Sequence, residues 1–269
     1  MIVLVGPPWA GSDEDYQKLA SATGLLPYDL KTRLKPNMWG VVKPIAEAIQ
    51  AEALAQHLVG LGFRACALDP AVAADTMRPI VPLTGLALQG DRLMLHLTER
   101  SMAVPAKALL VVVRGEVQLG QRQRDPRTTS SATFRAVSQN AADLRAVAEN
   151  KGFDAFAAAD LHFATVAWVA RVDARSFDFS NLAGATGSLA QDLDLLVEYL
   201  SEGTGARVDR GARASSLLSY AVGPARTATP VPGQGPMSRP PQGSTDERFD
   251  GYSRLVAEAE RLTRALAGP

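Results

Sequence analysis

The hydrophobic pattern over the first 68 residues alternates between continuous apolar runs and helical repeats. The run from Ile2 to Val5 is closed by Gly6 and two prolines, which is typical of a buried strand that cannot extend further. Apolar positions at helical spacing follow, with Gly24 and Gly62 as helix terminators. The pattern predicts strand, helix, helix, strand, helix and strand over residues 2–5, 13–24, 27–34, 41–42, 47–61 and 63–68.

A change of pattern after residue 68 indicates a boundary and then a β-rich region. Residues 69–82 mix alanine and aspartate with three prolines. Leucines then alternate at period two on both sides of Gln89-Gly90-Asp91, which predicts a hairpin with one buried face. A further strand is expected over residues 109–113, and we expect Gly115 to end it.

The second half of this region predicts another strand and a closing helix. Residues 161–172 are strand-like, and Ser188 with Gln191 forms a capping-box pattern for a helix that Gly203 stops. A meander closed by one helix is also the order of a pleckstrin-homology-like barrel, an analogy at the level of fold alone. The Phe-Asp-Phe-Ser turn at residues 177–180 resembles segments of uncharacterised bacterial proteins, which implies no activity.

The C-terminal part combines a linker pattern with an amphipathic helix. Proline, glycine, serine and glutamine dominate residues 227–244, which therefore bury too little surface to offset chain entropy. Helical periodicity resumes over residues 246–266. Its apolar stripe, the candidate partner-binding face, holds Tyr252, Leu255, Val256, Ala259, Leu262 and Leu266. Such a stripe docks on its own domain, on a second copy or in a partner's groove, and all three alternatives stay open here.

These patterns predict an α+β protein in four parts. Residues 1–75 form a small α/β domain, residues 76–205 a β-rich domain closed by a helix, residues 206–245 a flexible linker, and residues 246–269 an amphipathic helix. A length of 269 residues agrees with two small domains.

The first domain carries a family resemblance. Residues 23–31 read Thr-Gly-Leu-Leu-Pro-Tyr-Asp-Leu-Lys, and Val41-Val42 and an Ala-Glu-Ala-Leu helix that ends in glycine follow. This arrangement resembles the C-terminal domain of bacterial ribosomal protein L7/L12 over residues 1–70. The resemblance implies the fold of that domain. Lys31 matches a family lysine, whereas first-helix positions that are basic in the family hold Gln17 and Ala20 here.

Charge and cysteine content narrow the classes of partner and compartment. Basic and acidic residues number 28 each, so no global field attracts nucleic-acid backbones or anionic lipids, and nucleic acid is disfavoured as a partner. The sequence shows no apolar run of membrane-spanning length and no signal-peptide pattern, which predicts a cytoplasmic protein. The single cysteine, Cys66, excludes an intrachain disulfide and is expected to pack in a strand.

The loop from Gly6 to Ser12 is the candidate ligand site. It follows a predicted strand, opens a predicted helix and has the glycine spacing of a phosphate-binding loop, so Gly6, Gly11 and Ser12 are candidate contacts for phosphate or nucleotide. Ser12 stands where such loops place a lysine, and the two prolines of the loop lack N–H donors. A purely structural turn is the alternative interpretation.

Side chains capable of acid–base or metal chemistry are dispersed along the sequence. His57, His96 and His162 lie on different predicted elements without the short spacing of a zinc site, so no metal or other cofactor is predicted. Carboxylates such as Asp160 and Asp178 offer no pairing that sequence alone places across a cleft. No nucleophile-elbow motif is present, and no catalytic residue is assigned.

The densest local charge is the group Arg122, Arg124 and Arg127. These arginines are candidate contacts for an acidic partner or a phosphate, although such a cluster is also typical of a solvated loop. We therefore interpret the chain as a non-catalytic protein-interaction or adaptor module that binds a protein partner or a second copy through its domain surfaces and tethered helix. The alternatives are an enzyme acting on a phosphate or nucleotide ligand, and a translation-associated or nucleic-acid-binding accessory protein.

Overall fold

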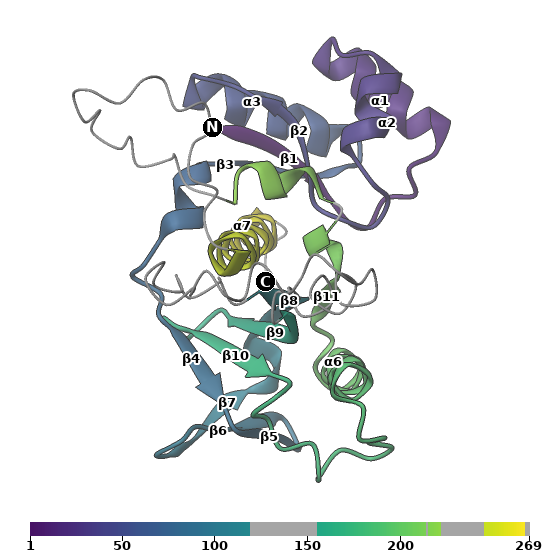
Figure 1. The fold of residues 1–269 in the computed structure, drawn as a ribbon. Helices are drawn as coiled ribbons and strands as arrows, with labels where there is room; N and C mark the ends of the chain where they lie inside the picture. Colours follow the sequence, from purple (N-terminus) through teal and green to yellow (C-terminus); the bar gives the residue numbers. More distant parts are fainter. Residues whose placement is uncertain (119–154, 214, 222–244, 267–269) are drawn as a thin grey trace, which may run out of the picture.

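The computed structural model describes residues 1–118, 155–213, 215–221 and 245–266. Within these residues the protein is mixed α+β, with two α/β units on opposite sides of the C-terminal helix (Figure 1). The predicted α+β class and the C-terminal helix are therefore confirmed. The L7/L12-like and pleckstrin-homology-like folds stay predictions.

The N-terminal unit is a three-stranded antiparallel sheet with helices on one face (Figure 1). The sheet order is β2-β1-β3, with β1 (Ile2–Gly6), β2 (Gly40–Pro44) and β3 (Arg64–Leu68). The helices are α1 (Asp13–Thr23), α2 (Pro27–Arg33) and α3 (Ala48–Gly60). The predicted order of strands and helices in this unit is confirmed.

Alternation along β1 distributes its side chains between two cores. Val3 and Val5 pack under the helices together with Leu19 of α1, whereas Ile2 and Leu4 belong to the cluster that includes the C-terminal helix. Both faces of this short strand are buried. The apolar run is continuous for that reason, since only a half-buried strand alternates between apolar and polar residues.

Local capping explains where α1 begins and ends. The Ser12 hydroxyl accepts a hydrogen bond from the Asp15 backbone N–H at 3.1 Å, and the Asp15 carboxylate accepts one from the Ser12 N–H at 3.0 Å. This reciprocal pair satisfies two N–H groups that the first helical turn leaves without intrahelical partners. Gly24 ends the helix with a φ of 70°, a conformation that glycine adopts without steric cost.

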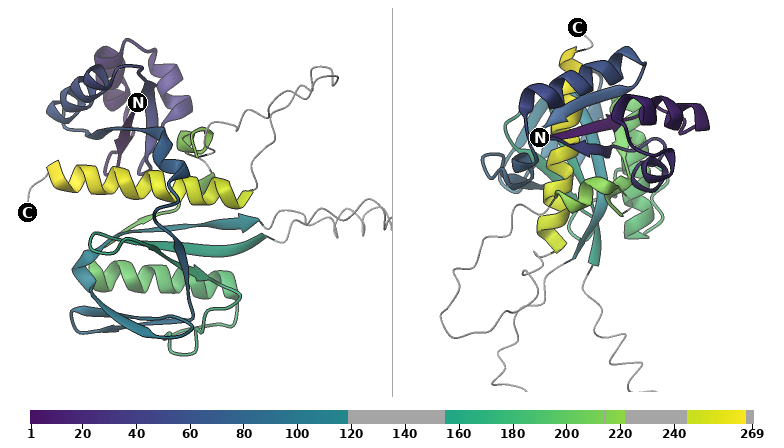
Figure 2. Two further views of the ribbon diagram at one scale, coloured as in Figure 1. Left: turned by 90° about the vertical axis from the view of Figure 1, so that its left-hand side faces the viewer. Right: turned by 90° about the horizontal axis from the view of Figure 1, so that it is seen from above.

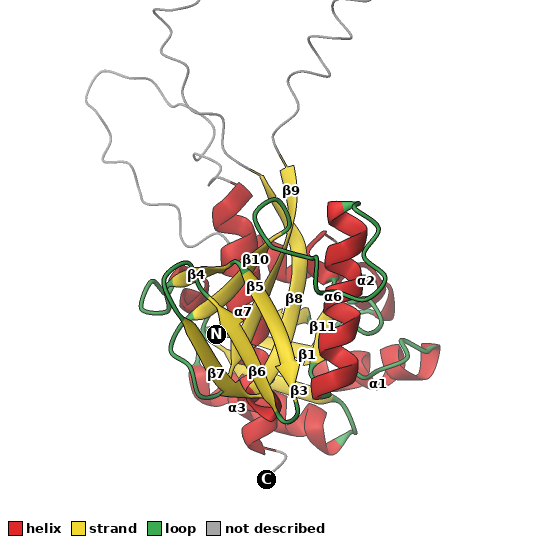
Figure 3. Cartoon of the chain, turned by 90° about the horizontal axis from the view of Figure 1, so that it is seen from below, coloured by secondary structure: helices red, strands yellow, loops and turns green. Residues whose placement is uncertain are grey.

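The second unit contains two sheets and one long helix. The five-stranded sheet, in the order β11-β8-β9-β10-β4, consists of β11 (Arg207–Asp209), β8 (Leu109–Gln118), β9 (Ala155–Phe163), β10 (Val169–Asp173) and β4 (Ile80–Leu83). The three-stranded sheet consists of β5 (Gly85–Gln89), β6 (Arg92–His96) and β7 (Ser101–Pro105). Helix α6 (Leu189–Thr204) packs beside them (Figure 3). The predicted hairpin is confirmed, because Gln89 pairs with Arg92.

Two strand predictions in this unit need correction. Strand β8 does not end at Gly115 but continues to Gln118, and the Phe249 ring occupies the space where a Gly115 side chain would lie. The strand expected over residues 161–172 is instead the end of β9, a reversal, and β10, with Ala170 paired antiparallel to Leu161. A continuous apolar pattern does not reveal where the chain turns back on itself.

The ends of α6 also differ from the prediction. The helix continues past Gly203 and is terminated by Gly205, which has a φ of 69°. The Ser188 side chain makes no capping hydrogen bond. The buried Asp192 carboxylate instead accepts hydrogen bonds from the backbone N–H groups of Thr186 and Gly187, at 2.6 and 3.0 Å. A carboxylate four residues inside the helix thus organises the preceding loop.

Part of the segment expected to be a linker is folded. After β11, residues 211–213 and 216–219 form short 3₁₀ helices, η4 and η5. The Ser215 hydroxyl donates to the Trp39 carbonyl at 2.5 Å, and the Val41 N–H donates to the Ser216 hydroxyl at 2.8 Å. These contacts with β2 order a stretch that has no clear periodicity of its own. Residues 222–244 lie outside the described part of the chain.

Helix α7 (Thr245–Leu266) crosses the molecule between the two units (Figure 2). One side faces β8 of the five-stranded sheet, and the other faces β3 and the 3₁₀ helix η1 (Pro70–Ala74). We call α7 and the sheet faces that contact it the α7 interface.

Candidate functional site

The apolar stripe of α7 is enclosed by its own chain. Four stripe residues are fully buried, namely Tyr252, Leu255, Val256 and Ala259, and Phe249 on the same helix is 3% exposed. They belong to one cluster with side chains of β1 and β8, and Leu262 is partly buried against the same cluster. Of the three docking alternatives left open by the sequence, the structure shows docking on the same chain. The side chain of Leu266 lies outside what the structure describes.

Beside this apolar stripe, α7 and the five-stranded sheet share a buried polar cluster. Arg171 of β10 binds the Asp160 carboxylate through two hydrogen bonds of 2.7 and 2.8 Å, and it donates a third, of 2.6 Å, to Asp250 of α7. His162 Nε2 lies 2.7 Å from the Ser253 hydroxyl. The side chains of Asp160, His162 and Ser253 are at most 4% exposed. The cluster thus ties α7 to β9 and β10.

Burial and charge together set the protonation of this cluster. Burial lowers the pKa of His162 to about 4, because the cationic ring would lose its hydration; the charge of Asp160 opposes this shift, and the nearby arginines add to it. Burial acts to raise the pKa of Asp160, but the charge and hydrogen bonds of Arg171 outweigh it and leave that pKa below its usual value. At neutral pH the cluster therefore holds a neutral histidine and an ionised Asp160–Arg171 pair.

A second polar cluster joins α7 to both units. The Trp39 indole N–H donates to the Glu260 carboxylate at 2.8 Å, Arg64 of β3 donates to it at 2.6 Å, and Arg207 of β11 also binds it. About two turns earlier on the helix, the Tyr252 hydroxyl donates to the buried Asp209 carboxylate at 2.6 Å. Glu260 thus connects the N-terminal unit to the second unit through a single carboxylate.

The serine and histidine of the first cluster lie close enough for proton transfer, but the site is closed. Ser253 and His162 are 1% and 4% exposed, so α7 itself excludes any substrate from the pair. Their hydrogen bond holds the helix on β9. While α7 is docked, the histidine and serine therefore attach the helix to β9 and are closed to substrate.

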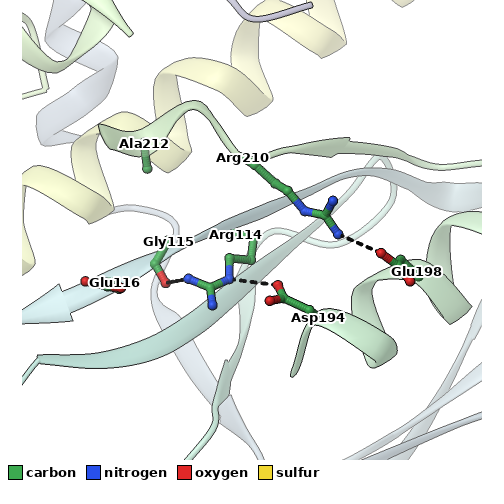
Figure 4. A pocket seen from close by; sticks show the side chains of 7 residues that line it. All are labelled: Arg114, Gly115, Glu116, Asp194, Glu198, Arg210 and Ala212. Atoms are coloured by element: carbon green, nitrogen blue, oxygen red, sulfur yellow. Dashed lines mark hydrogen bonds and ion pairs between the residues drawn. The ribbon is translucent and has the colours of Figure 1, made fainter. Parts of the chain in front are cut away.

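An open polar pocket lies where β8, α6 and η4 meet (Figure 4). It encloses about 420 Å³. Two carboxylates of α6 form ion pairs there: Asp194 with Arg114 at 3.1 Å and Glu198 with Arg210 at 3.3 Å. Each guanidinium in this β8–α6 pocket already has a carboxylate partner. The pairs connect α6 to β8 and to the chain that follows β11.

The candidate phosphate loop adopts a structural role in this conformation. Gly6 belongs to β1, where a side chain would collide with the Trp39 ring, and Gly11 has a φ of 65° against Pro36. Ser12 is bonded to Asp15 in the capping box. Three acidic residues occupy the first turn of α1, and their charge repels a phosphate at that helix end. The structure therefore favours the turn interpretation.

The remaining predicted residues fall in separate places. Cys66 is buried in β3, as expected, and burial raises its pKa to about 12, so the thiol is protonated at neutral pH. His57 is exposed on α3, and His96 lies at the end of β6 beside Ser101. The three arginines at positions 122, 124 and 127 lie outside the described residues.

Sequence reasoning missed the grouping of His162 and Asp160 with α7. The two residues lie two positions apart on one strand, and Asp250 and Ser253 lie three apart on the helix, so each pair shares a face. That spacing is the only signal in the sequence, and it does not show that the faces meet. Residues 163–249 lie between the two pairs along the chain, and part of this stretch is outside the described residues.

The chain matches no protein-family model, no curated protein and no solved structure. In the described parts of the chain, no three His, Cys, Asp or Glu side chains are grouped so as to hold a metal ion. No described helix has the length and apolarity needed to cross a membrane.

Proposed function

We propose that this protein is a non-catalytic interaction module whose two α/β units are fixed relative to each other by the C-terminal helix, so that a partner binds its outer surfaces. The observation that supports this proposal is the position of α7. Its Asp250, Ser253 and Glu260 side chains are engaged in holding the helix between the units. The side chains that could act as nucleophile, base or acid are thus engaged in holding α7 in place.

The polar contacts of α7 also give the proposal its mechanism. Glu260 contacts Arg64 in one unit and Arg207 in the other, so the docked helix contributes directly to the alignment of the two units. A partner that touches both units recognises that alignment. The interface between the two units contains several buried charges. In this it resembles an interface between separate proteins more than the interior of a single domain.

The experiment compares partner capture by three chains expressed in the source cell. Glu260→Ala removes the shared carboxylate, and Arg264→Ala changes an exposed residue of the same helix as the matched control. After cross-linking in the cell, the wild type and Arg264→Ala should capture the same proteins, and Glu260→Ala should lose those that contact both units. Hydrogen exchange of residues 245–266 in each purified chain reports whether the helix is docked. An unchanged partner set with an undocked helix contradicts the proposal.

A second measurement addresses catalysis directly. A fluorophosphonate probe labels activated serines, and Ser253→Ala supplies the background. We expect no labelling of Ser253 in the native chain at neutral pH, because the hydroxyl is 1% exposed and bonded to His162. Rapid labelling that is abolished in Ser253→Ala would show that Ser253 is an activated nucleophile and would contradict the proposal.

A further inference from the structure

A second pocket, distinct from the one in Figure 4, lies between β5, α6 and the loop over residues 177–183. It encloses about 360 Å³, within the usual range for small-molecule sites. We call it the β5–α6 pocket. Its walls are apolar and its rim is acidic, a combination that the β8–α6 pocket does not share.

Close packing at one end of α6 creates this space. A side chain at Gly203 would lie 2.5 Å from Leu88, so the end of the helix approaches the hairpin as closely as a glycine permits. Toward Leu195 and Tyr199, one to two turns earlier, the helix and β5 leave a hollow between them. The close approach at Gly203 and the separation near Tyr199 therefore form the two ends of this cavity.

The opposite wall is also fixed. The Asp178 N–H donates to the Thr84 carbonyl at 2.9 Å, and the Asp178 carboxylate accepts the Ser180 N–H at 2.9 Å. Phe177 and Phe179, whose ring centroids are 4.9 Å apart, anchor this loop in the core beneath the sheets. A ligand thus meets a preformed cavity, which reduces the conformational cost of binding.

The apolar part of the pocket is only partly covered by the protein. Leu86, Leu182 and Leu195 are each half-buried and line it from β5, the loop and α6. Apolar surface in a concave, partly hydrated site is a favourable contact for an apolar ligand group. The walls alone therefore select a hydrocarbon or aromatic body.

The rim selects charge. Asp178, Glu198 and Glu202 all lie exposed on the lining, and none of the described residues that line the pocket is lysine or arginine. Glu198 is paired with Arg210 at 3.3 Å, which leaves Asp178 and Glu202 as the excess negative charge. Glu202 makes no hydrogen bond or ion pair with the described residues, and the Tyr199 ring, 40% exposed, lies between the two glutamates in sequence. Carboxylates with an aromatic face attract ammonium groups and repel anions.

We propose that the β5–α6 pocket binds a small organic cation, an amine carried on an apolar body. The body lies against the leucines, and the ammonium group lies at the rim between Asp178, Glu202 and the Tyr199 ring. This proposal is independent of the interaction function, since the described residues that line the cavity come from β5, α6 and the loop over residues 177–183 and not from α7.

The test uses the full-length chain and three probes of nearly equal shape: 2-phenylethylamine, 2-phenylethanol and 3-phenylpropionate. Each is titrated to millimolar concentration while amide chemical shifts are followed by NMR. We expect the amine to shift amides of β5, α6 and residues 177–183, with an affinity that falls as salt is added. The alcohol should bind more weakly, and the carboxylate should not bind.

Two variants locate the site. Glu202→Gln keeps the shape of the rim and should weaken amine binding by about threefold, as expected for one exposed charge contact. Asp194→Asn, in the β8–α6 pocket, is the matched control and should leave the affinity unchanged. Equal shifts with all three probes, shifts confined to other elements, or no shift with the amine would each overturn the proposal.

Discussion

The helix-covered core of the N-terminal unit and the α7 interface are two buried regions built on different principles. The first consists of apolar side chains such as Val3, Leu19 and Leu58. The second combines an apolar cluster with buried Glu260, Asp160 and their arginine partners. Apolar contacts stabilise many arrangements about equally, whereas a misplaced carboxylate costs several kcal/mol. We infer that the polar groups fix the register of α7, and that the apolar core supplies stability without that selectivity.

The largest expected effect comes from breaking a buried ion pair. Arg171→Ala leaves the Asp160 carboxylate, 1% exposed, and Asp250 without their shared cation. We expect the free energy of unfolding to fall by about 3–5 kcal/mol, measured by urea denaturation. Arg264→Ala on the exposed side of α7 should change it by less than about 0.5 kcal/mol. A loss below about 1 kcal/mol for Arg171→Ala would show that the pair is solvated in solution.

A substitution that creates a cavity in the apolar core of the N-terminal unit is the counterpart of Arg171→Ala. Leu58→Ala removes a fully buried side chain of α3 and should cost about 2–5 kcal/mol. The titratable side chain in that cluster is Tyr16, and burial raises its pKa above 10, so it keeps its proton at pH 5 and at pH 8. The loss should therefore be the same at both values. Chemical denaturation at both values tests this. A loss that differs by more than about 1 kcal/mol between them would remove the distinction between the two regions.

The α7 interface, in contrast, should respond to pH through His162. Burial lowers its pKa from 6.5 to about 4, so below pH 6.5 the unfolded chain binds a proton that the folded chain does not. Stability should therefore fall as the pH drops from 6.5 toward 4 and should be unaffected by this group above 6.5. The total is on the order of 3 kcal/mol. In His162→Gln that slope should disappear, and an unchanged slope would contradict the assignment.

The smallest effect is expected from a single hydroxyl. Tyr252→Phe removes the hydrogen bond to Asp209, which keeps Arg207 and the Gly211 N–H as partners. We expect a loss of about 1 kcal/mol in the free energy of unfolding. The ring stays in place, so the amide spectrum of α7 should change only near residue 252. Undocking of the helix in this variant would mean that the hydroxyl positions the helix by itself.

The sequence predicts local elements of this fold better than their assembly. The Gly24 terminator and the hairpin at residues 89–92 depend on near neighbours, and the structure confirms them. The structure of residues 215–221 and the passage of β8 through Gly115 depend on Trp39 and Phe249, which are far away in the sequence. Periodicity carries no information about such partners.

The same limit applies to the candidate sites. The stripe of α7 could be predicted from its spacing, but its burial depends on two sheets formed elsewhere in the chain. The grouping of His162 with Ser253, and the hollow between Leu86 and Leu195, arise from packing between distant segments. The glycine spacing of residues 6–12 resembles that of a phosphate-binding loop, and the three acidic residues in the first turn of α1 act against phosphate binding there.

Hydrogen exchange of the intact wild-type chain tests the central claim most directly. An isolated amphipathic helix of 22 residues exchanges its amides rapidly in water, whereas a helix packed between two sheets exchanges only when it undocks. We expect amides of residues 249–263 to be protected to the same degree as those of β8. Exchange of that segment as fast as the exposed turns of the chain would contradict the claim that α7 holds the two units together.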